Sequence, residues 1–164
     1  DIDWGDYPYV TSSHCTSAGA LLNCIPHHAV RNVWGVGKVY DTYVGAKLFE
    51  PNNTIFSEIR KVGEEYGATT GRPRQCNWLD LDQLKKSIRV NGVTHLVLNK
   101  VDVLEQLDKF VVYCDGTELK FRTLENMKKF IMSDLVEHKN GNNTISEVYF
   151  SGNKENIGVQ QVAW

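Results

Sequence analysis

Apolar residues recur at helical spacing in three stretches of the chain, residues 52–67, 79–92 and 125–141. The ends of these stretches carry residues that cap or stop helices. They are Asn53 or Thr54 before the first stretch and Gly67 after it, Asp80 or Asp82 before the second and Gly92 after it, and Gly141 after the third. The pattern therefore predicts three amphipathic helices.

Two further helices are predicted nearer the amino-terminal end. Small and apolar residues from Ser17 to Leu22 predict a short helix. Apolar positions in residues 27–40 also have helical spacing, although Gly35 and Gly37 interrupt them. We therefore expect a second helix there, followed by an extended segment.

Short apolar runs predict the strands. Residues 94–102 form one run of strand length, and residues 145–153 form another. Between them, two alternating segments flank Asp115 and Gly116, which is typical of a β-hairpin. Helices alternating with buried strands predict an α/β fold, with a mostly parallel central sheet flanked by helices and an added antiparallel hairpin.

Composition narrows the class of protein. The chain has 164 residues, 41% of them hydrophobic and 23% charged, which fits one globular domain. Its net charge of −2 argues against a nucleic-acid partner, and no apolar run is long enough to span a membrane. The four cysteines have no CxxC spacing and follow no secretory signal, so we expect reduced thiols, no metal site in this chain and a cytoplasmic protein.

The first motif with recognisable chemistry is Asn99-Lys100-Val101-Asp102, which fits the pattern Asn-Lys-x-Asp. A guanine base presents two adjacent N–H donors, and one aspartate carboxylate can accept both. A lysine stem can lie across the purine face. The alternative is that these are ordinary solvated residues at the end of a strand.

A small GTPase is the first kind of protein that this motif suggests. A GTPase also needs a phosphate loop of the form Gly-x-x-x-x-Gly-Lys-Ser/Thr. The nearest match, Gly35 to Tyr40, lacks the first glycine spacing and the hydroxyl. We therefore expect the phosphate-binding part of any guanine site to lie outside these residues.

The second motif is the stretch Gly67 to Arg74, GATTGRPR. Its glycines permit tight turns, its threonines offer hydroxyl donors, and Arg72 and Arg74 can each form a bidentate pair with an anion. The pattern favours a loop that closes over a small anion, and the alternative is a solvated surface loop.

Hydroxyls also cluster at Thr11, Ser12 and Ser13, just before the first predicted helix. They predict either a phosphate site or a simple helix cap. The histidines form no catalytic or metal-binding pattern, and we expect His95 to be a core residue.

Read in order, several strings resemble the adenylosuccinate synthetase family. They are DIDWGDYPYVTSS, VYDTYVGA, EEYGATTGRPRQCNWLD, LNKVDVL and YFSGN, so the resemblance runs from residue 1 to about Gly152. The resemblance covers only the carboxyl-terminal half of the family's enzyme. Because the chain also begins at Asp1 without a methionine, we expect residues 1–164 to be that half, with the amino-terminal half absent.

The resemblance implies a homodimeric ligase. In that reaction a nucleoside triphosphate phosphorylates the 6-oxygen of a purine monophosphate, and the amine of L-aspartate then displaces the phosphate. GTP or ATP would be the co-substrate, and magnesium ligands would lie in the missing half. The alternative is a purine-nucleotide-binding module without catalysis.

The resemblance also assigns residues. The monophosphate would contact Thr11 and Ser12. The aspartate loop would consist of Gly67, Ala68, Thr69, Thr70, Gly71, Arg72 and Arg74, with Arg72 and Arg74 as its catalytic side chains. The base of the triphosphate would contact Lys100, Asp102, Ser151 and Gly152.

Three departures from the family pattern change these expectations. Pro73 and Gln75 interrupt what is usually a run of arginines. Phe150 replaces a serine in the base-contacting turn, which predicts an altered base preference. The divergence resembles phage enzymes that use dGMP instead of IMP, some of which use ATP.

Overall fold

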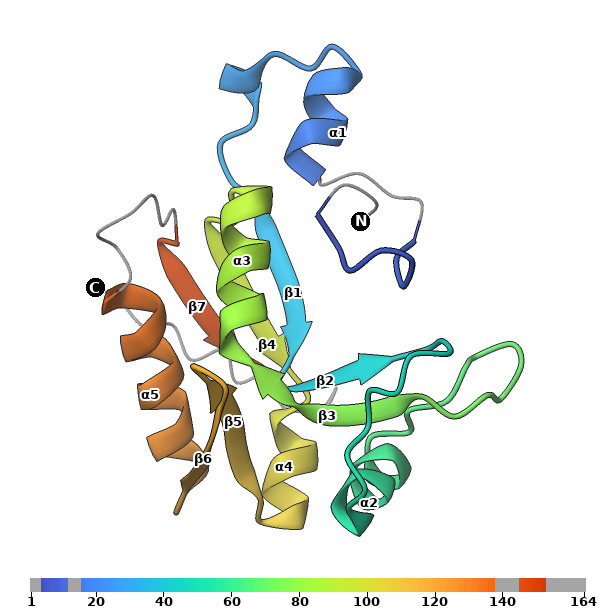
Figure 1. Ribbon diagram of the computed structural model, residues 1–164. Coiled ribbons are helices and arrows are strands. Elements are labelled where there is room, and N and C mark those ends of the chain that lie inside the picture. The colour runs from blue at the N-terminus through green and yellow to red at the C-terminus, as the bar shows by residue number, and fades with distance from the viewer. Residues whose placement is uncertain (1–3, 12–15, 138–144, 153–164) are drawn as a thin grey trace.

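The computed structural model describes residues 4–11, 16–137 and 145–152 (Figure 1). The elements, in chain order, are α1 (Thr16–Leu22), a 3-10 turn (His27–Ala29), β1 (Trp34–Lys38), β2 (Tyr40–Tyr43), α2 (Thr54–Val62), β3 (Gln75–Asp80), α3 (Leu81–Asn91), β4 (His95–Asn99), α4 (Val101–Leu107), β5 (Phe110–Cys114), β6 (Thr117–Phe121), α5 (Leu124–Glu137) and β7 (Glu147–Phe150).

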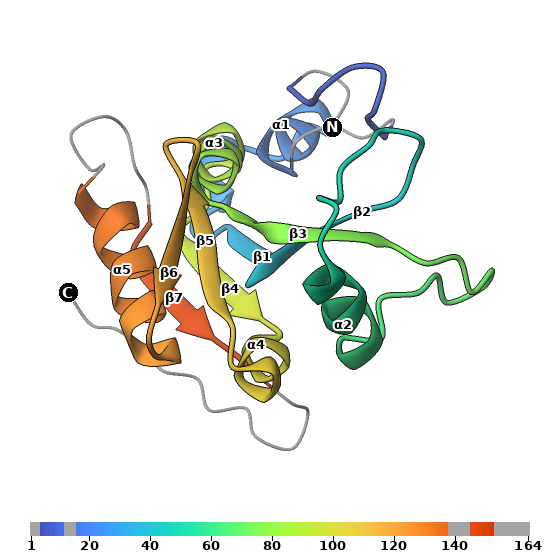
Figure 2. The ribbon, with the colours of Figure 1, turned by 60° about the horizontal axis from the view of Figure 1, so that its bottom comes forward.

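Two sheets form the frame of the molecule (Figure 2). One has three strands in the order β1-β4-β7, all parallel. The other has four strands in the order β2-β3-β5-β6, in which β3 and β5 are parallel and the outer pairs are antiparallel. The hairpin of β5 and β6 turns at Asp115 and Gly116, as predicted, and the α/β fold is confirmed.

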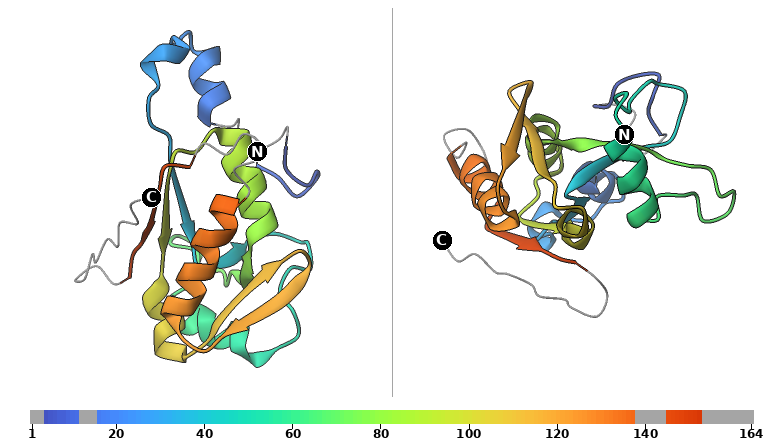
Figure 3. Two further views of the ribbon diagram at one scale, coloured as in Figure 1. Left: turned by 90° about the vertical axis from the view of Figure 1, so that its left-hand side faces the viewer. Right: turned by 90° about the horizontal axis from the view of Figure 1, so that it is seen from below.

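The two faces of the parallel sheet differ in burial. The register aligns Trp34 with His95 and Val36 with Val97 on one face, where Trp34 is 54% exposed and Val36 is 70% exposed. On the opposite face, the side chains that β4 and β7 contribute are at most 2% exposed, namely Leu96, Leu98, Val148 and Phe150. Helices α3 and α5 lie on one side of this sheet (Figure 3).

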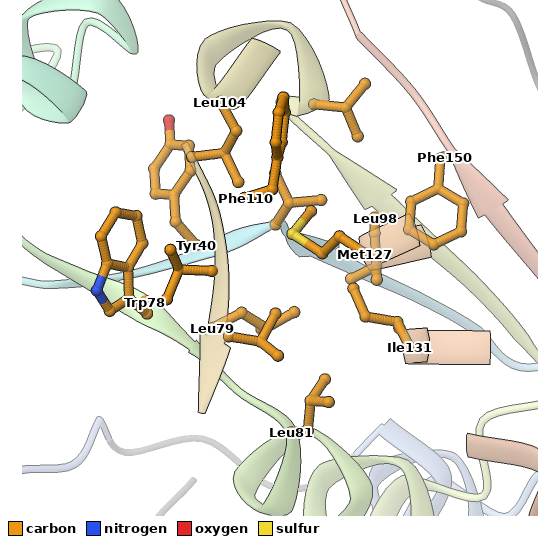
Figure 4. Packing of buried hydrophobic residues seen from close by; sticks show 14 of the residues in the cluster. Tyr40, Trp78, Leu79, Leu81, Leu98, Leu104, Phe110, Met127, Ile131 and Phe150 are labelled. Atoms are coloured by element: carbon orange, nitrogen blue, oxygen red, sulfur yellow. The ribbon is translucent and has the colours of Figure 1, made fainter. Parts of the chain in front are cut away.

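The core is built from both sheets and from α2, α3, α4 and α5, and Figure 4 shows part of it. Its labelled members are Tyr40, Trp78, Leu79, Leu81, Leu98, Leu104, Phe110, Met127, Ile131 and Phe150. Full burial of one such aliphatic or aromatic side chain stabilises the fold by about 1.5–3 kcal/mol. The core therefore holds the carboxyl ends of β4 and β7 in a fixed relation.

The helix predicted over residues 27–40 is wrong, because the stretch holds only a 3-10 turn and its second half is strand. After the 3-10 turn, β1 pairs in parallel with β4. Gly35 and Gly37 explain the outcome, since a Cβ on Gly35 would lie 2.9 Å from Val93 and a Cβ on Gly37 would lie 3.3 Å from Leu98. The glycines that weaken a helix are thus the residues that let this strand approach the core.

The end of α2 also differs from the prediction. The helix stops at Gly63 instead of Gly67, and the Gly63 N–H donates to the Ile59 carbonyl oxygen at 2.8 Å. Glu64 then adopts a left-handed conformation (φ 54°). Residues 64–74 therefore form a longer connection between α2 and β3 than expected.

Capping residues set other helix ends as predicted. Asn53 caps α2, Asp80 caps α3 by accepting from the N–H groups of Asp82 and Gln83, and Gly92 ends α3 in the left-handed region (φ 61°). The prediction missed β3 and α4. Helix α4 has no side-chain cap, because its first flanking residue is a lysine.

Candidate functional site

Lys100, Asp102, Ser151 and Gly152 come together where β4 and β7 end. The Val101 N–H donates to the Ser151 carbonyl oxygen at 3.2 Å, which joins the start of α4 to the residue after β7. A Cβ on Gly152 would lie 3.4 Å from the Cβ of Asp102. The carboxyl ends of parallel strands are the usual position for ligands in α/β sheets.

Two acceptor atoms in this region are buried and unpaired. Within the described part of the chain, Asn99 Oδ1 and Asp102 Oδ1 have no hydrogen-bond partner. A buried polar atom left without a partner costs about 1–3 kcal/mol. The neighbourhood therefore offers acceptors that suit a ligand with N–H donors.

Lys100 and Phe150 differ from what the motif suggested. Lys100 is left-handed (φ 66°), and its Nζ donates to the Gly63 carbonyl oxygen at 2.9 Å, at the end of α2. The side chain of Phe150 is 2% exposed and lies in the core. The altered base preference expected from Phe150 stays a prediction, and a ring buried in the core could affect a base only through the backbone of the turn that follows it.

The loop after α2 closes on itself through its own backbone. The Gly67 N–H donates to the Arg72 carbonyl oxygen and the Gly71 N–H to the Gly67 carbonyl oxygen, each at 2.8 Å. Gly71 has a positive φ of 64°, and Thr70 Oγ1 accepts from the Arg72 N–H at 3.4 Å. The side chains between the two stem glycines are exposed, namely Ala68, Thr69 and Thr70.

The two loop arginines are not equivalent. The Arg72 side chain is exposed and forms no ion pair within the described residues. Arg74 is 34% exposed in its side chain, and its Nη1 lies 2.8 Å from Glu65 Oε2. Arg72 is thus available to an anion, whereas Arg74 is already paired.

Glu65 is the centre of a buried polar network that sequence reasoning missed. Its carboxylate accepts from Lys38 Nζ at 2.7 Å, from the Tyr40 hydroxyl at 2.7 Å and from Arg74 at 2.8 Å. Burial alone would raise the pKa of Glu65, but these three donors outweigh it and hold that pKa below its usual value. Burial, and then the bond to Glu65, raises the pKa of Tyr40. No local pattern could reveal the network, because Lys38 and Tyr40 are distant in sequence.

Gln75 is a second residue that the sequence did not identify. Its Oε1 accepts from the N–H groups of Phe49 and Glu50 at 2.8 and 3.1 Å, and its Nε2 donates to the Lys47 carbonyl oxygen at 2.8 Å. A side chain that both accepts and donates is needed here, and a guanidinium has no acceptor. Gln75, which stands where the family usually has an arginine, therefore links the segment before α2 to β3 through these hydrogen bonds.

Thr11 lies in a groove of about 780 Å³ between residues 5–11 and 42–49. Tyr9, Tyr43 and Lys47 line the same groove. Lys47 pairs with Asp6 at 2.9 Å and lowers the pKa of that carboxyl. Ser12, the other residue expected at a monophosphate, lies outside the described residues.

The predicted site residues thus form three separate groups: Thr11 in its groove, the 67–74 loop, and the neighbourhood of Asp102 where β4 and β7 end. The 67–74 loop extends beyond α2 and β3, whereas Asp102 lies at the start of α4 (Figures 1 and 2). An indirect connection exists, because Lys100 binds the Gly63 carbonyl and Glu65, two residues later, binds Arg74. The loop and the Asp102 neighbourhood are therefore braced against the same end of α2.

Possible metal ligands gather elsewhere. Among the described residues, Asp82, Cys114 and Asp115 bring ligand atoms within 4.8 Å of one another. The Lys85 ammonium lies 3.0 Å from Asp82, and burial raises the pKa of Cys114 to about 11. Magnesium prefers oxygen ligands, so a thiol beside a lysine does not fit it.

Two other expectations concern the histidines and membranes. His95 is not the core residue expected, because it is partly exposed and lies on the same sheet face as Trp34, on which its ring stacks with centroids 4.5 Å apart. Its Nδ1 lies 2.8 Å from Thr94 Oγ1. In the described ranges, no helix combines the length and the apolar character that crossing a membrane requires.

Comparisons with known proteins agree with the geometry. The family model described as adenylosuccinate synthetase matches residues 1–145. Adenylosuccinate synthetases from Thermodesulfovibrio yellowstonii and Cytophaga hutchinsonii are 45% and 48% identical to the chain, over 80% and 68% of its length. These matches span 31% and 27% of the relatives, so the chain is about a third of their length.

A solved structure gives the same result. Fully ligated adenylosuccinate synthetase from Plasmodium falciparum matches with a TM-score of 0.61 and 37% identity, over 79% of this chain and 33% of that one. The family model covers far more than half of the chain, and the relatives exceed 40% identity. The chain therefore belongs to the adenylosuccinate synthetase family.

Proposed function

We propose that the polypeptide carrying this chain is a ligase that joins L-aspartate to the 6-position of a purine nucleoside monophosphate. The observation that supports it best is the meeting of Lys100, Asp102, Ser151 and Gly152 beside buried, unpaired acceptor oxygens. In this proposal Asp102 accepts N–H donors of the triphosphate's base, and Gly152 lets that base approach the backbone.

The reaction has two balanced steps. The purine loses its N1 proton as its 6-oxygen attacks the γ-phosphorus of GTP or ATP, and GDP or ADP leaves. The phosphorylated 6-oxygen of IMP or dGMP is then a good leaving group. The aspartate amine then attacks carbon 6 and loses a proton, and inorganic phosphate leaves. Because the reactants are all anionic, the site needs fixed cations and little competing water.

We assign the aspartate carboxylates to the loop. The exposed guanidinium of Arg72 and the exposed hydroxyl of Thr69 have no hydrogen-bond partner among the described residues. Thr70 Oγ1 accepts from the Arg72 N–H but keeps its own proton to donate. Thr11, which lies in the groove that also holds Lys47, is proposed to contact the acceptor's monophosphate together with Ser12. Charge-assisted bonds of this kind are about twice as strong as neutral ones.

The proposal leaves magnesium to the rest of the polypeptide. The cluster of Asp82, Cys114 and Asp115 does not suit magnesium, and no role proposed for this chain depends on that metal. We further propose that residues 1–164 form the carboxyl-terminal part of the ligase, that the protein is a homodimer and that it works in the cytoplasm.

The test is a substrate panel on the complete protein. IMP and dGMP are crossed with GTP and ATP, with and without aspartate, and phosphate release and the aspartate adduct are measured. Turnover that requires aspartate in at least one combination supports the ligase and names its substrates. Nucleotide binding without turnover in all four combinations would instead support a non-catalytic binding module.

A further inference from the structure

Glu65 is a buried charge that the proposed chemistry leaves without a role. It is 1% exposed, and only Tyr66 separates it from Gly67, the first residue of the 67–72 loop. Removing a carboxylate from water is costly unless it is paired and hydrogen-bonded. Its partners should therefore reveal its task.

Both oxygens of Glu65 are occupied by donors from three directions. Oε1 accepts from Tyr40, and Oε2 accepts from Lys38 and Arg74. Lys38 ends β1 and Tyr40 begins β2, so two donors come from the sheets. The third donor, Arg74, follows the loop in the chain. Glu65 therefore links the end of the loop to the two sheets.

The backbone around Glu65 forms a short stem under the loop. The Arg74 N–H donates to the Glu65 carbonyl oxygen at 3.0 Å, and Tyr66 and Pro73 form an antiparallel bridge. On the outer side, Arg60 Nε donates to the Arg74 carbonyl oxygen at 2.6 Å. Side chains therefore bind Arg74 at both its guanidinium and its carbonyl oxygen. Among the described residues, the hydrogen bonds of residues 67–72 are those of the loop's own turn.

We infer that Glu65 is a positioning residue that fixes Arg74 at the stem of the 67–72 loop and leaves Arg72 as the loop's free guanidinium. The two arginines then divide their tasks, with Arg74 setting the position of the loop and Arg72 meeting the anion. The inference rests on the proposed function only for the identity of that anion, a dicarboxylate.

The experiment measures amide hydrogen exchange of the loop in the complete protein. Glu65→Gln removes the charge, and Arg74→Gln removes its loop partner. Glu64→Gln is the matched control, since Glu64 is the adjacent residue and is exposed. Peptides covering residues 66–73 should exchange at least about 10-fold faster in the first two variants and within about 2-fold of wild type in the control.

A double variant shows whether the two side chains act through each other. If Glu65 acts by holding Arg74, the double variant exchanges no faster than the faster single variant. Effects that multiply would overturn the inference, as would a Glu65→Gln rate equal to the control's. Should Glu65→Gln fail to fold, Arg74→Gln decides alone, because its side chain is partly exposed, and a wild-type exchange rate would then refute the anchor.

Kinetics of the complete enzyme separate the anchor from the aspartate assignment. With Glu65→Gln, the KM for aspartate should rise about 10-fold while the KM values of both nucleotides stay within about 2-fold, and Glu65→Asp should restore part of the loss. Faster loop exchange with an unchanged aspartate KM would support the anchor and count against the loop as an aspartate site. If the loop exchanges at the wild-type rate in every variant, the positioning role of Glu65 is overturned, whatever the kinetic values are.

Discussion

Asp102 is a carboxylate whose surroundings are incomplete without a ligand. One of its oxygens is buried with no partner among the described residues, and Gly152 lies against its Cβ. An adjacent pair of N–H donors, such as guanine presents, would satisfy it. Whether the donor nucleotide is GTP or ATP therefore depends on this one side chain in the proposal.

We expect Asp102→Asn to reduce the preference for GTP over ATP by roughly 10- to 100-fold, because a charged acceptor becomes an amide that can also donate. The measurement is the ratio of kcat/KM for the two nucleotides. Glu105→Gln, an exposed change on the same helix, is the control. An unaltered ratio would remove Asp102 from the base site.

Arg72 allows a similar test of the loop. We expect Arg72→Ala to raise the KM for aspartate by roughly 10- to 100-fold, since one bidentate charge-assisted pair is lost. Arg89→Ala removes an exposed arginine from α3 and should leave that KM unchanged. Steady-state kinetics on the complete protein provide the values, and equal KM values for both variants would contradict the assignment.

Asp41 predicts a pH dependence of stability. Burial raises the pKa of Asp41 to about 6, so the folded state keeps a proton that the unfolded state has lost above its ordinary pKa of 3.8. Stability should therefore fall as pH rises from 3.8 to about 6, and the penalty should persist above that pH.

Asp41→Asn should remove this penalty. We expect the variant to be more stable than wild type by about 3 kcal/mol at pH 8 and nearly equal to it at pH 4. Urea unfolding at both pH values measures the difference. The same stability gain at both pH values would show that ionisation of Asp41 is not the cause.

Among the elements, the local sequence predicts both ends of α3 correctly, whereas around β1 it predicts a helix where the structure has a strand. Asp80 and Gly92 bound α3 through local hydrogen bonds and a left-handed turn. By contrast, the apolar spacing before β1 resembles a helix, but pairing with β4 and the fit of Gly35 against Val93 make it a strand. Local signals therefore predict an element well only where no distant strand competes for its backbone.

Gly92 is where the α3 stop signal can be tested. Its φ of 61° is strained for any residue with a Cβ, so Gly92→Ala should destabilise the fold by about 1 kcal/mol. Gly19→Ala in α1 is the opposite control, since a Cβ there meets no atom within 4 Å and should be neutral or slightly stabilising. Equal unfolding midpoints for the two variants would contradict the strain argument.

For the molecule as a whole, the parallel sheet is the unusual feature. Sheets of parallel strands normally have both faces covered, yet here Trp34 and Val36 stay exposed on one face. The chain spans about a third of its relatives, so they have more polypeptide than the described residues contain. An apolar face of this kind favours association in solution.

We expect Val36→Lys to reduce self-association and hydrophobic-dye binding of the 164-residue chain, with little change in its unfolding midpoint. Val44→Lys is the control, because Val44 is an exposed valine outside the strands. Light scattering and dye fluorescence measure the effect. An equal effect of both variants would show that added charge, and not the sheet face, is responsible.

Local patterns were sufficient for α2, α3, α5, the β5–β6 hairpin and the α/β class, because caps, turns and amphipathic spacing act within a few residues. They also identified the Asn-Lys-x-Asp and loop motifs that led to the family. Contacts distant in sequence set the rest: the strand at β1, the end of α2 at Gly63, and the pairing of Arg74 with Glu65. A motif names its side chains, but whether each is free or already paired depends on which others the fold buries beside it.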